Sequence, residues 1–184
     1  MAKPKLIIVE GAIGSGKSTL SKLLRERIPH STLLDLGSIQ DDSKINSFTY
    51  HSTILSMLFD LRMVGSNFIL SRSYLSNEIY SRLGKKKYDN DDNFTYFNER
   101  LKTLSLFYEV KVFILSSNPA DFESRFNKRN KFQYVNHSTE EALKQQRQYL
   151  LIADELREKG IDVTVFNNSG FNANQLVDIV LSSI

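Results

Sequence analysis

Short apolar runs alternate along this chain with longer segments in which apolar residues recur every three or four positions. The runs are bounded by polar residues or glycine, which is typical of strands buried in a parallel sheet. They predict strands at residues 5–9, 32–36, 67–70, 110–115 and 161–166. The helical spacing predicts helices at residues 17–28, 44–63, 74–83, 94–108, 119–126, 139–158 and 172–184.

Strands that alternate with helices predict an α/β fold, with three α/β/α layers around a five-stranded parallel sheet. Crossovers in such a sheet are right-handed, so the carboxyl ends of the strands gather at one edge, where ligands bind. We therefore expect Gly11–Ser18, Asp35 and Ser71–Arg72 to converge there, although they are far apart in the sequence. The chain has no internal repeat, low-complexity tract or long linker, so we expect one domain over residues 1–184.

The composition is that of an ordinary globular chain, with 41% hydrophobic and 24% charged residues among 184. A net charge of +3 suits anionic small molecules but is too small to argue for nucleic acid. The absence of cysteine excludes disulfides and thiolate zinc sites. The N-terminal segment runs straight into the first strand without room for a signal peptide, and the apolar runs are far shorter than the roughly 20 residues of a membrane helix. We expect a cytoplasmic protein with no membrane partner.

The strongest motif is Gly11–Ser18, which matches the phosphate-binding pattern G-x-x-x-x-G-K-S between a strand and an amphipathic helix. Its glycines let the backbone turn its N–H groups inward, and with the helix dipole these groups form a site for nucleotide phosphates. Lys17 is expected to reach the outer phosphates of ATP, and the Ser18 hydroxyl to bind Mg²⁺. A simple glycine-rich turn would leave the lysine unexplained. The predicted nucleotide contacts are Gly11, Ala12, Ile13, Gly14, Ser15, Gly16, Lys17, Ser18 and Thr19.

Phosphoryl transfer needs further cations, and the sequence offers them in two places. Arg72 leaves the third strand at the ligand edge, where its guanidinium can grip a phosphate with two hydrogen bonds; the alternative is a surface salt bridge. Segment 125–131 carries four cations and no acid. A lid over about residues 125–137 would lower Arg125 and Arg129 onto ATP, and the alternative is a solvated basic turn.

Two acids end strands at the same edge. Asp35 could take a proton from an acceptor hydroxyl or hold a metal-bound water, unless it only caps a turn. Glu10 could orient Mg²⁺ or an acceptor group, unless it bonds a neighbouring amide. Four aromatic side chains could stack on a base, although each is more often part of a core: Phe48, Tyr50, Tyr74 and Tyr80. Neither the three histidines nor Asp89–Asp92, which lacks the glycine and closing glutamate of a calcium loop, has metal-ligand spacing.

These residues resemble a family, the small P-loop kinases of nucleosides and nucleoside monophosphates, over nearly the whole chain. Val9–Thr19 looks most like the loop of deoxynucleoside kinases, and Ile13 stands where thymidylate kinases usually have an aspartate. The pattern Arg125-x-x-x-Arg129-x-Lys131 is similar to the arginine-rich lid of both groups. The compact length also resembles that of phage-encoded thymidylate kinase-like proteins.

A second stretch carries the same resemblance. Arg72–Tyr80 is similar to the thymidylate kinase pattern D-R-Y-x-x-S-x-x-A-Y, in which Arg72, Ser76 and Tyr80 match. Arg72 and Ser73 also fit the E-R-S of deoxynucleoside kinases. Both groups carry an acid just before the arginine, where this chain has Ser71.

The resemblance implies an ATP- and Mg²⁺-dependent kinase of a deoxynucleoside 5′-monophosphate, thymidylate kinase-like, which binds only small molecules and for which a homodimer stays open. The residues expected to bind the acceptor are Glu10, Asp35, Arg62, Arg72, Ser76 and Tyr80, with Arg62 included if its helix faces the cleft. The main alternative is a deoxynucleoside kinase that phosphorylates a 5′-hydroxyl, with Asp35 as general base. Ser71 would favour a third hypothesis, a nucleotide-binding regulator without transfer activity.

Overall fold

The short apolar runs form one parallel sheet. The computed structural model describes residues 3–36, 46–84, 93–128 and 138–184. The strands are β1 (Lys5–Gly11), β2 (Ser31–Asp35), β3 (Asn67–Ser71), β4 (Glu109–Ser116) and β5 (Val163–Asn167). All neighbouring pairs are parallel, in the order β2-β3-β1-β4-β5. The predicted five-stranded parallel sheet is therefore confirmed, and β1, which leads into the phosphate-binding motif, lies at its centre.

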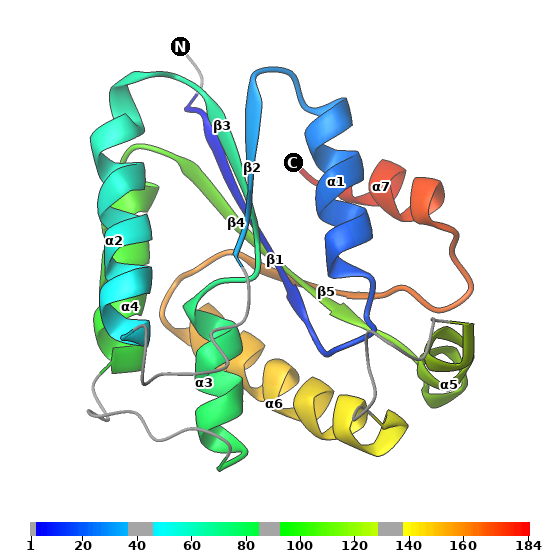
Figure 1. Ribbon diagram of the computed structural model, residues 1–184. Helices are drawn as coiled ribbons and strands as arrows, with labels where there is room; N and C mark the ends of the chain where they lie inside the picture. Colours follow the sequence, from blue (N-terminus) through cyan, green and yellow to red (C-terminus); the bar gives the residue numbers. More distant parts are fainter. Residues whose placement is uncertain (1–2, 37–45, 85–92, 129–137) are drawn as a thin grey trace.

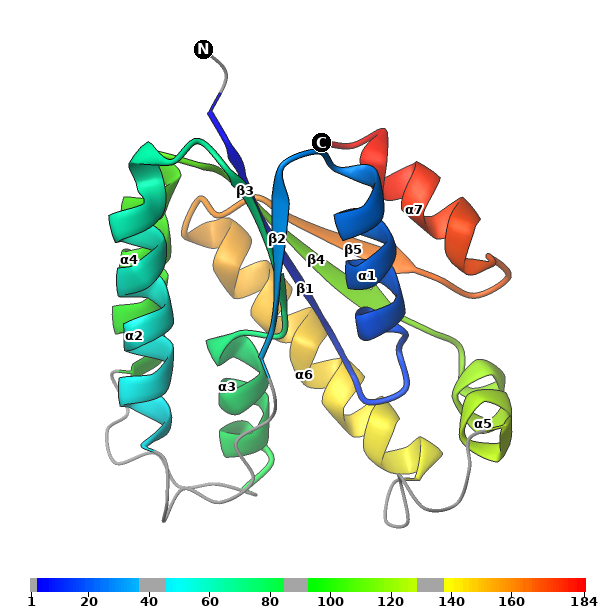
Figure 2. The same cartoon turned by 45° about the horizontal axis from the view of Figure 1, so that its top comes forward.

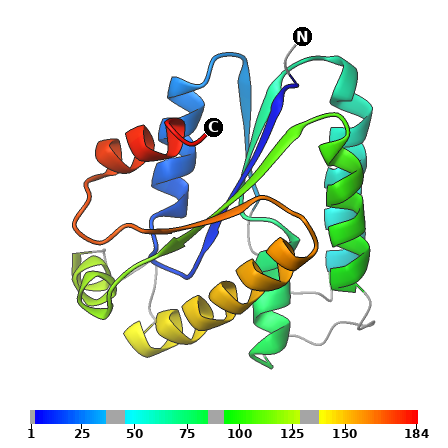
Figure 3. The same cartoon turned by 180° about the vertical axis from the view of Figure 1, so that it is seen from behind.

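Helices cover both faces of the sheet (Figures 1 and 3). One face carries α1 (Lys17–Arg27) and α7 (Ala173–Leu181). The other carries α2 (Ser47–Asp60), α3 (Tyr74–Arg82), α4 (Asn93–Ser105) and α6 (Thr139–Glu158), while α5 (Pro119–Lys128) packs on α6 beside the ligand edge. A short 3₁₀ turn, η1 (Leu61–Met63), follows α2. None of the helices in the described ranges is both long enough and apolar enough to cross a membrane.

The alternation of side chains along β1 explains why its residues are apolar without interruption. Leu6 and Ile8 pack with the layer of α2, α3, α4 and α6, whereas Ile7 and Val9 pack with α1 and α7. All four side chains are fully buried. A central strand covered on both faces favours apolar residues on both faces, because the side chains at these four positions do not reach water.

Polar caps set the helix ends. The predicted helix at 44–63 begins at Ser47, because the Asn46 side chain accepts a hydrogen bond from the Thr49 N–H (2.9 Å). Ser138 caps α6 in the same way through the Glu141 N–H (3.1 Å). Each cap pairs an N–H group that the first helical turn would leave without a partner.

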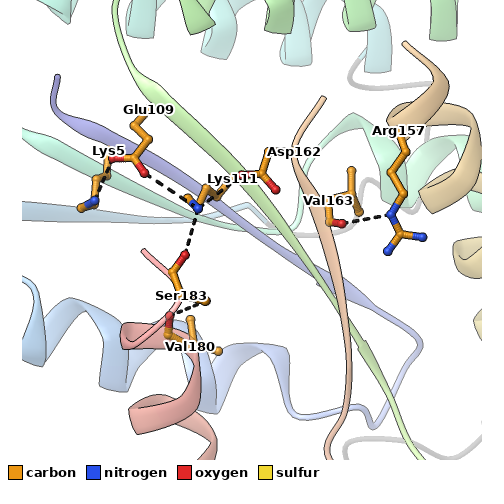
Figure 4. Close-up of polar contacts among 8 residues, drawn as sticks. All are labelled: Lys5, Glu109, Lys111, Arg157, Asp162, Val163, Val180 and Ser183. Atoms are coloured by element: carbon orange, nitrogen blue, oxygen red, sulfur yellow. Dashed lines mark hydrogen bonds and ion pairs between the residues drawn. The ribbon is translucent and has the colours of Figure 1, made fainter. Parts of the chain in front are cut away.

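A group of charges ties together the amino-terminal ends of the strands (Figure 4). Lys5 pairs with Glu109 (2.8 Å), and Lys111 pairs with Asp162 (3.2 Å) and donates to the Ser183 carbonyl oxygen (2.8 Å). Part-exposed pairs of this kind contribute at most about 1 kcal/mol each. These lysines lie at the edge where β1 begins, opposite the phosphate-binding motif, so they join elements rather than form a ligand site.

Candidate active site

The turn between β1 and α1 leads into a helix start that no side chain caps. Gly16 is the N-cap of α1, with φ +93°. Gly11 has to be glycine, because an added Cβ would lie 2.6 Å from the Leu115 carbonyl oxygen. An uncapped helix start attracts anions, so this loop has the backbone geometry of a phosphate site.

Lys17 supplies the positive charge within this loop. Its side chain is nearly buried, and Nζ donates to the carbonyl oxygens of Gly11 (2.6 Å) and Ala12 (2.8 Å). A hollow that is open to solvent lies beside it, lined by Ile13, Gly14, Gly16, Lys17, Ser18, Thr19 and Arg72. The hollow thus joins most of the predicted nucleotide-contacting residues, with Ser18 and Thr19 exposed at its rim.

Arg72 comes from outside the loop and also lines this hollow. Its backbone is left-handed (φ +77°), and its N–H donates to the Val9 carbonyl oxygen (3.0 Å), which fixes it beside β1. The next residue, Ser73, is the N-cap of α3. Strained backbone of this kind is held where the surroundings fix it, and functional sites often contain it.

Glu10 turns away from the hollow into the interior. It is fully buried, and its carboxylate accepts hydrogen bonds from three hydroxyl groups: Ser73 (2.7 Å), Ser76 (2.8 Å) and Tyr149 (2.9 Å). Burial raises the pKa of Glu10, although the Ser73 hydrogen bond and the charge of Lys17 act in the opposite direction. Glu10 and Ser76, both expected to bind the acceptor, are thus hydrogen-bonded to each other, and their contact with an acceptor stays a prediction. Tyr80 is half-buried on the same helix.

Asp35 reaches the ligand edge at the end of β2. It is exposed and lies opposite Ser71 in the register of β2 and β3. The Ser71 hydroxyl is 1% exposed and has no hydrogen-bond partner within the described part of the chain. No group of three or more His, Asp or Glu side chains among the described residues could hold a metal by itself.

Arg62 is not brought to the site. It follows α2 at the amino-terminal edge of the sheet, where it donates to the Phe59 carbonyl oxygen (2.7 Å). Its guanidinium lies over the rings of Phe59 (4.1 Å) and Phe107 (5.4 Å). The inclusion of Arg62 among the acceptor-binding residues is therefore corrected, because the helix that carries it leads away from the hollow.

Arg125 supports the loop from behind. Its guanidinium donates to the Gly14 carbonyl oxygen (3.1 Å), to the Ser117 hydroxyl (2.8 Å) and to the Asn168 side-chain oxygen (3.2 Å). Figure 2 shows the loop between β1 and α1 lying between α5 and α6. Arg129 and the rest of the proposed lid to residue 137 lie outside the described residues, as do Asp89–Asp92.

Two polar residues that the sequence did not suggest hold the same loop. Asn168, which follows β5, donates to the Ser15 carbonyl oxygen (2.6 Å) and accepts from Ser117 (2.5 Å). Gln145 of α6 accepts from the Ile13 N–H (3.0 Å). Asn168 could have been found, because it stands at the carboxyl end of a strand like the other site residues.

The candidate base-stacking residues mostly belong to the core. Tyr74 is 2% exposed, donates to the Asn98 side-chain oxygen (2.7 Å) and packs against Phe97. Phe48 packs against Phe97 and Tyr96. His51 is buried and within hydrogen-bond distance of Asn77, whereas His30 is exposed.

No family model and no curated protein sequence matches the chain. Solved structures do match. A thymidylate kinase from Candida albicans is 18% identical with a TM-score of 0.62, over 100% of this chain and 92% of that one. A deoxyadenosine kinase from M. mycoides with dCTP bound is 15% identical with a TM-score of 0.59, over 97% of each chain. The complex of that kinase with dCMP and dCDP is also 15% identical, with a TM-score of 0.58 over 97% of each chain. The chain therefore has the P-loop fold shared by these nucleotide and nucleoside kinases.

Proposed function

We propose that this chain, which has the fold of P-loop nucleoside and nucleotide kinases, transfers the terminal phosphoryl group of ATP to a deoxynucleoside 5′-monophosphate. One observation carries the proposal: Lys17, Ser18 and Arg72 line a single hollow at the uncapped start of α1. Charge from two distant segments thus surrounds a site whose backbone already favours a phosphate.

The residues divide the work of binding and orienting. The N–H groups of the loop and of the first turn of α1 would hold the inner phosphates of ATP. Lys17 Nζ, which donates to two loop carbonyl oxygens in this structure, would donate to the outer phosphates instead. The Arg72 guanidinium would grip the transferred group and the acceptor phosphate together. Positioning of this kind supplies most of the catalysis in phosphoryl transfer, because the reaction needs little covalent help.

The residues present also fit a magnesium ion. Mg²⁺ usually keeps several waters and takes one or two protein oxygens besides the phosphates, and Ser18 offers an exposed hydroxyl at the rim of the hollow. When bound, the ion would neutralise charge on the phosphate oxygens.

The acceptor could instead be the 5′-hydroxyl of a deoxynucleoside. Two observations favour this second candidate: Arg62 lies at the far edge and adds no cation for an acceptor phosphate, and Asp35 is an exposed carboxylate at the ligand edge. The similar solved structures do not favour either acceptor, a deoxynucleoside monophosphate or a deoxynucleoside, since one is named a thymidylate kinase and the other a deoxyadenosine kinase.

A coupled ADP-release assay separates these candidates. The purified chain is incubated with Mg-ATP and, one at a time, dTMP, dUMP, dCMP, dGMP, dAMP and the matching deoxynucleosides. Turnover on monophosphates alone supports the proposal, and turnover on deoxynucleosides alone supports the second candidate. ATP binding in calorimetry without turnover on any acceptor would contradict both and favour a nucleotide-binding regulator.

A further inference from the structure

An exposed carboxylate and a buried hydroxyl lie side by side at the carboxyl ends of β2 and β3. Asp35 and Ser71 are register partners on these parallel strands, so their side chains project from the same face of the sheet. The residues two positions earlier, Leu33 and Ile69, pack with the α1 layer, which identifies that face. Asp35 and Ser71 therefore face the helix whose first turn carries Ser18.

The Ser71 hydroxyl lacks a partner. It is 1% exposed, and no group in the described ranges accepts or donates a hydrogen bond to it. The hydroxyls of Ser15 in the loop and Ser21 in the sheet-facing stripe of α1 are in the same situation. Buried hydroxyl groups nearly always have a partner, so an unpaired one at the strand end beside the phosphate loop points to bound water or a ligand.

The structure also decides between the two acids that end strands at this edge. Glu10 is on the face of α3 and α6, is fully buried and has both oxygens bonded to hydroxyls. Asp35 is exposed, its carboxylate forms no hydrogen bond with the described residues, and it lies on the α1 face. Of these two acids, Asp35 is the one on the α1 face, where Ser18 lies in the first turn of α1.

We propose that Asp35 positions the Mg²⁺ of bound Mg-ATP through a metal-bound water, and that the Ser71 hydroxyl is a second hydrogen-bond partner of that water. This inference rests on the proposed use of Mg-ATP. Neighbouring strands are about 4.8 Å apart, and β3 with the small Ser71 side chain lies between β2 and β1. A carboxylate on β2 therefore reaches the Mg²⁺ more readily through a bound water than by direct coordination. Asp35 is then a positioning residue for the metal and not the base that activates an acceptor.

The test measures metal binding apart from turnover. Mn²⁺ replaces Mg²⁺, a non-hydrolysable ATP analogue occupies the site, and free Mn²⁺ is followed by electron paramagnetic resonance. Asp35→Asn should weaken Mn²⁺ binding to the protein–nucleotide complex by about 10- to 100-fold, the usual effect of losing an outer-shell partner. Binding of the metal-free analogue should stay unchanged. Asp60→Asn, which removes an exposed carboxylate at the opposite edge of the sheet, is the matched control and should bind Mn²⁺ like the wild type.

The decisive variant moves the carboxylate from Asp35 on β2 to position 71 on the neighbouring strand β3. Asp35→Asn combined with Ser71→Asp should restore Mn²⁺ affinity to within a few-fold of the wild type, which a merely structural role of Asp35 would not produce. Wild-type Mn²⁺ affinity in Asp35→Asn overturns the inference, even if turnover falls, because Asp35 would then act on the acceptor. Failure of the double variant to recover affinity also overturns it. The proposed function fails differently, since the wild-type chain would then bind no nucleotide or would bind Mn²⁺ and nucleotide without turning over any acceptor.

Discussion

Replacing Glu10 by glutamine should remove a pH dependence from the stability of this chain. Burial raises the pKa of Glu10 above its ordinary value of 4.5. Between that value and the raised one, the folded chain therefore holds a proton that the unfolded chain has released. Stability from this group is complete below pH 4.5 and is lost as the pH rises through the window, by up to about 1.4 kcal/mol per pH unit.

The size of the effect follows from the three hydroxyls. Glutamine keeps one oxygen for Ser76 and Tyr149, and the Ser73 hydroxyl can turn to accept from the new amide. Glu10→Gln should therefore cost less than about 1 kcal/mol at low pH and nothing at high pH, where the wild type must bury a charge. Glu10→Ala removes the acceptor of all three hydroxyls, at about 1–3 kcal/mol for each group left unpaired. The hydroxyl oxygens of Ser76 and Tyr149 are 3.1 Å apart and can bond to each other, which offsets part of this loss. Glu10→Ala should therefore lower the free energy of unfolding by about 3 kcal/mol or more.

Urea unfolding at several pH values between about 5 and 8 measures these differences. The control is Glu26→Gln, an exposed glutamate on α1. The stability of Glu10→Gln relative to the wild type should rise with pH, whereas that of the control should stay flat. A constant difference between Glu10→Gln and the wild type across the range would refute the argument, as would an alanine variant that loses less than about 1 kcal/mol.

Three further predictions concern the loop and its supports. Lys17→Ala should abolish phosphoryl transfer with little change in melting temperature, whereas Lys22→Ala, exposed on the same helix, should be active; near-normal turnover of Lys17→Ala would contradict the phosphate-loop assignment. Gly11→Ala should lose ATP binding in calorimetry, because its Cβ would overlap a backbone oxygen at 2.6 Å and φ is +145°; retained binding would show that the loop can shift. Arg125→Ala should raise the KM for ATP by loosening Gly14, whereas Arg129→Ala should mainly lower kcat; equal effects on both constants would argue against this division of roles.

The layered fold could be predicted because it depends on local pattern. Apolar runs and helical spacing are written into neighbouring residues, and the rule that strand carboxyl ends share an edge correctly brought Arg72 to the loop. The same rule should have excluded Arg62. A helix that follows one parallel strand and precedes the next must return to the amino-terminal edge, so its last turn lies away from ligands.

Other features of the site depend on contacts that no local pattern shows. The hydrogen bond from Tyr149 to Glu10 joins residues 139 positions apart, and that from Asn168 to Ser15 joins residues 153 apart. Sequence alone could not say that Glu10 would be surrounded by hydroxyls, because the partners come from α3 and α6. Candidate residues are therefore easier to name than the direction in which each side chain points.

The left-handed backbone of Arg72 gives a way to recognise relatives that have changed their role. An arginine in this conformation costs on the order of 1 kcal/mol, which glycine or asparagine would largely avoid. Selection for stability alone would therefore exchange this arginine, and only a demand for its charge would keep it. A descendant that retains the lysine of the loop but has glycine or asparagine at this position would be expected to hold nucleotides without passing on their phosphate.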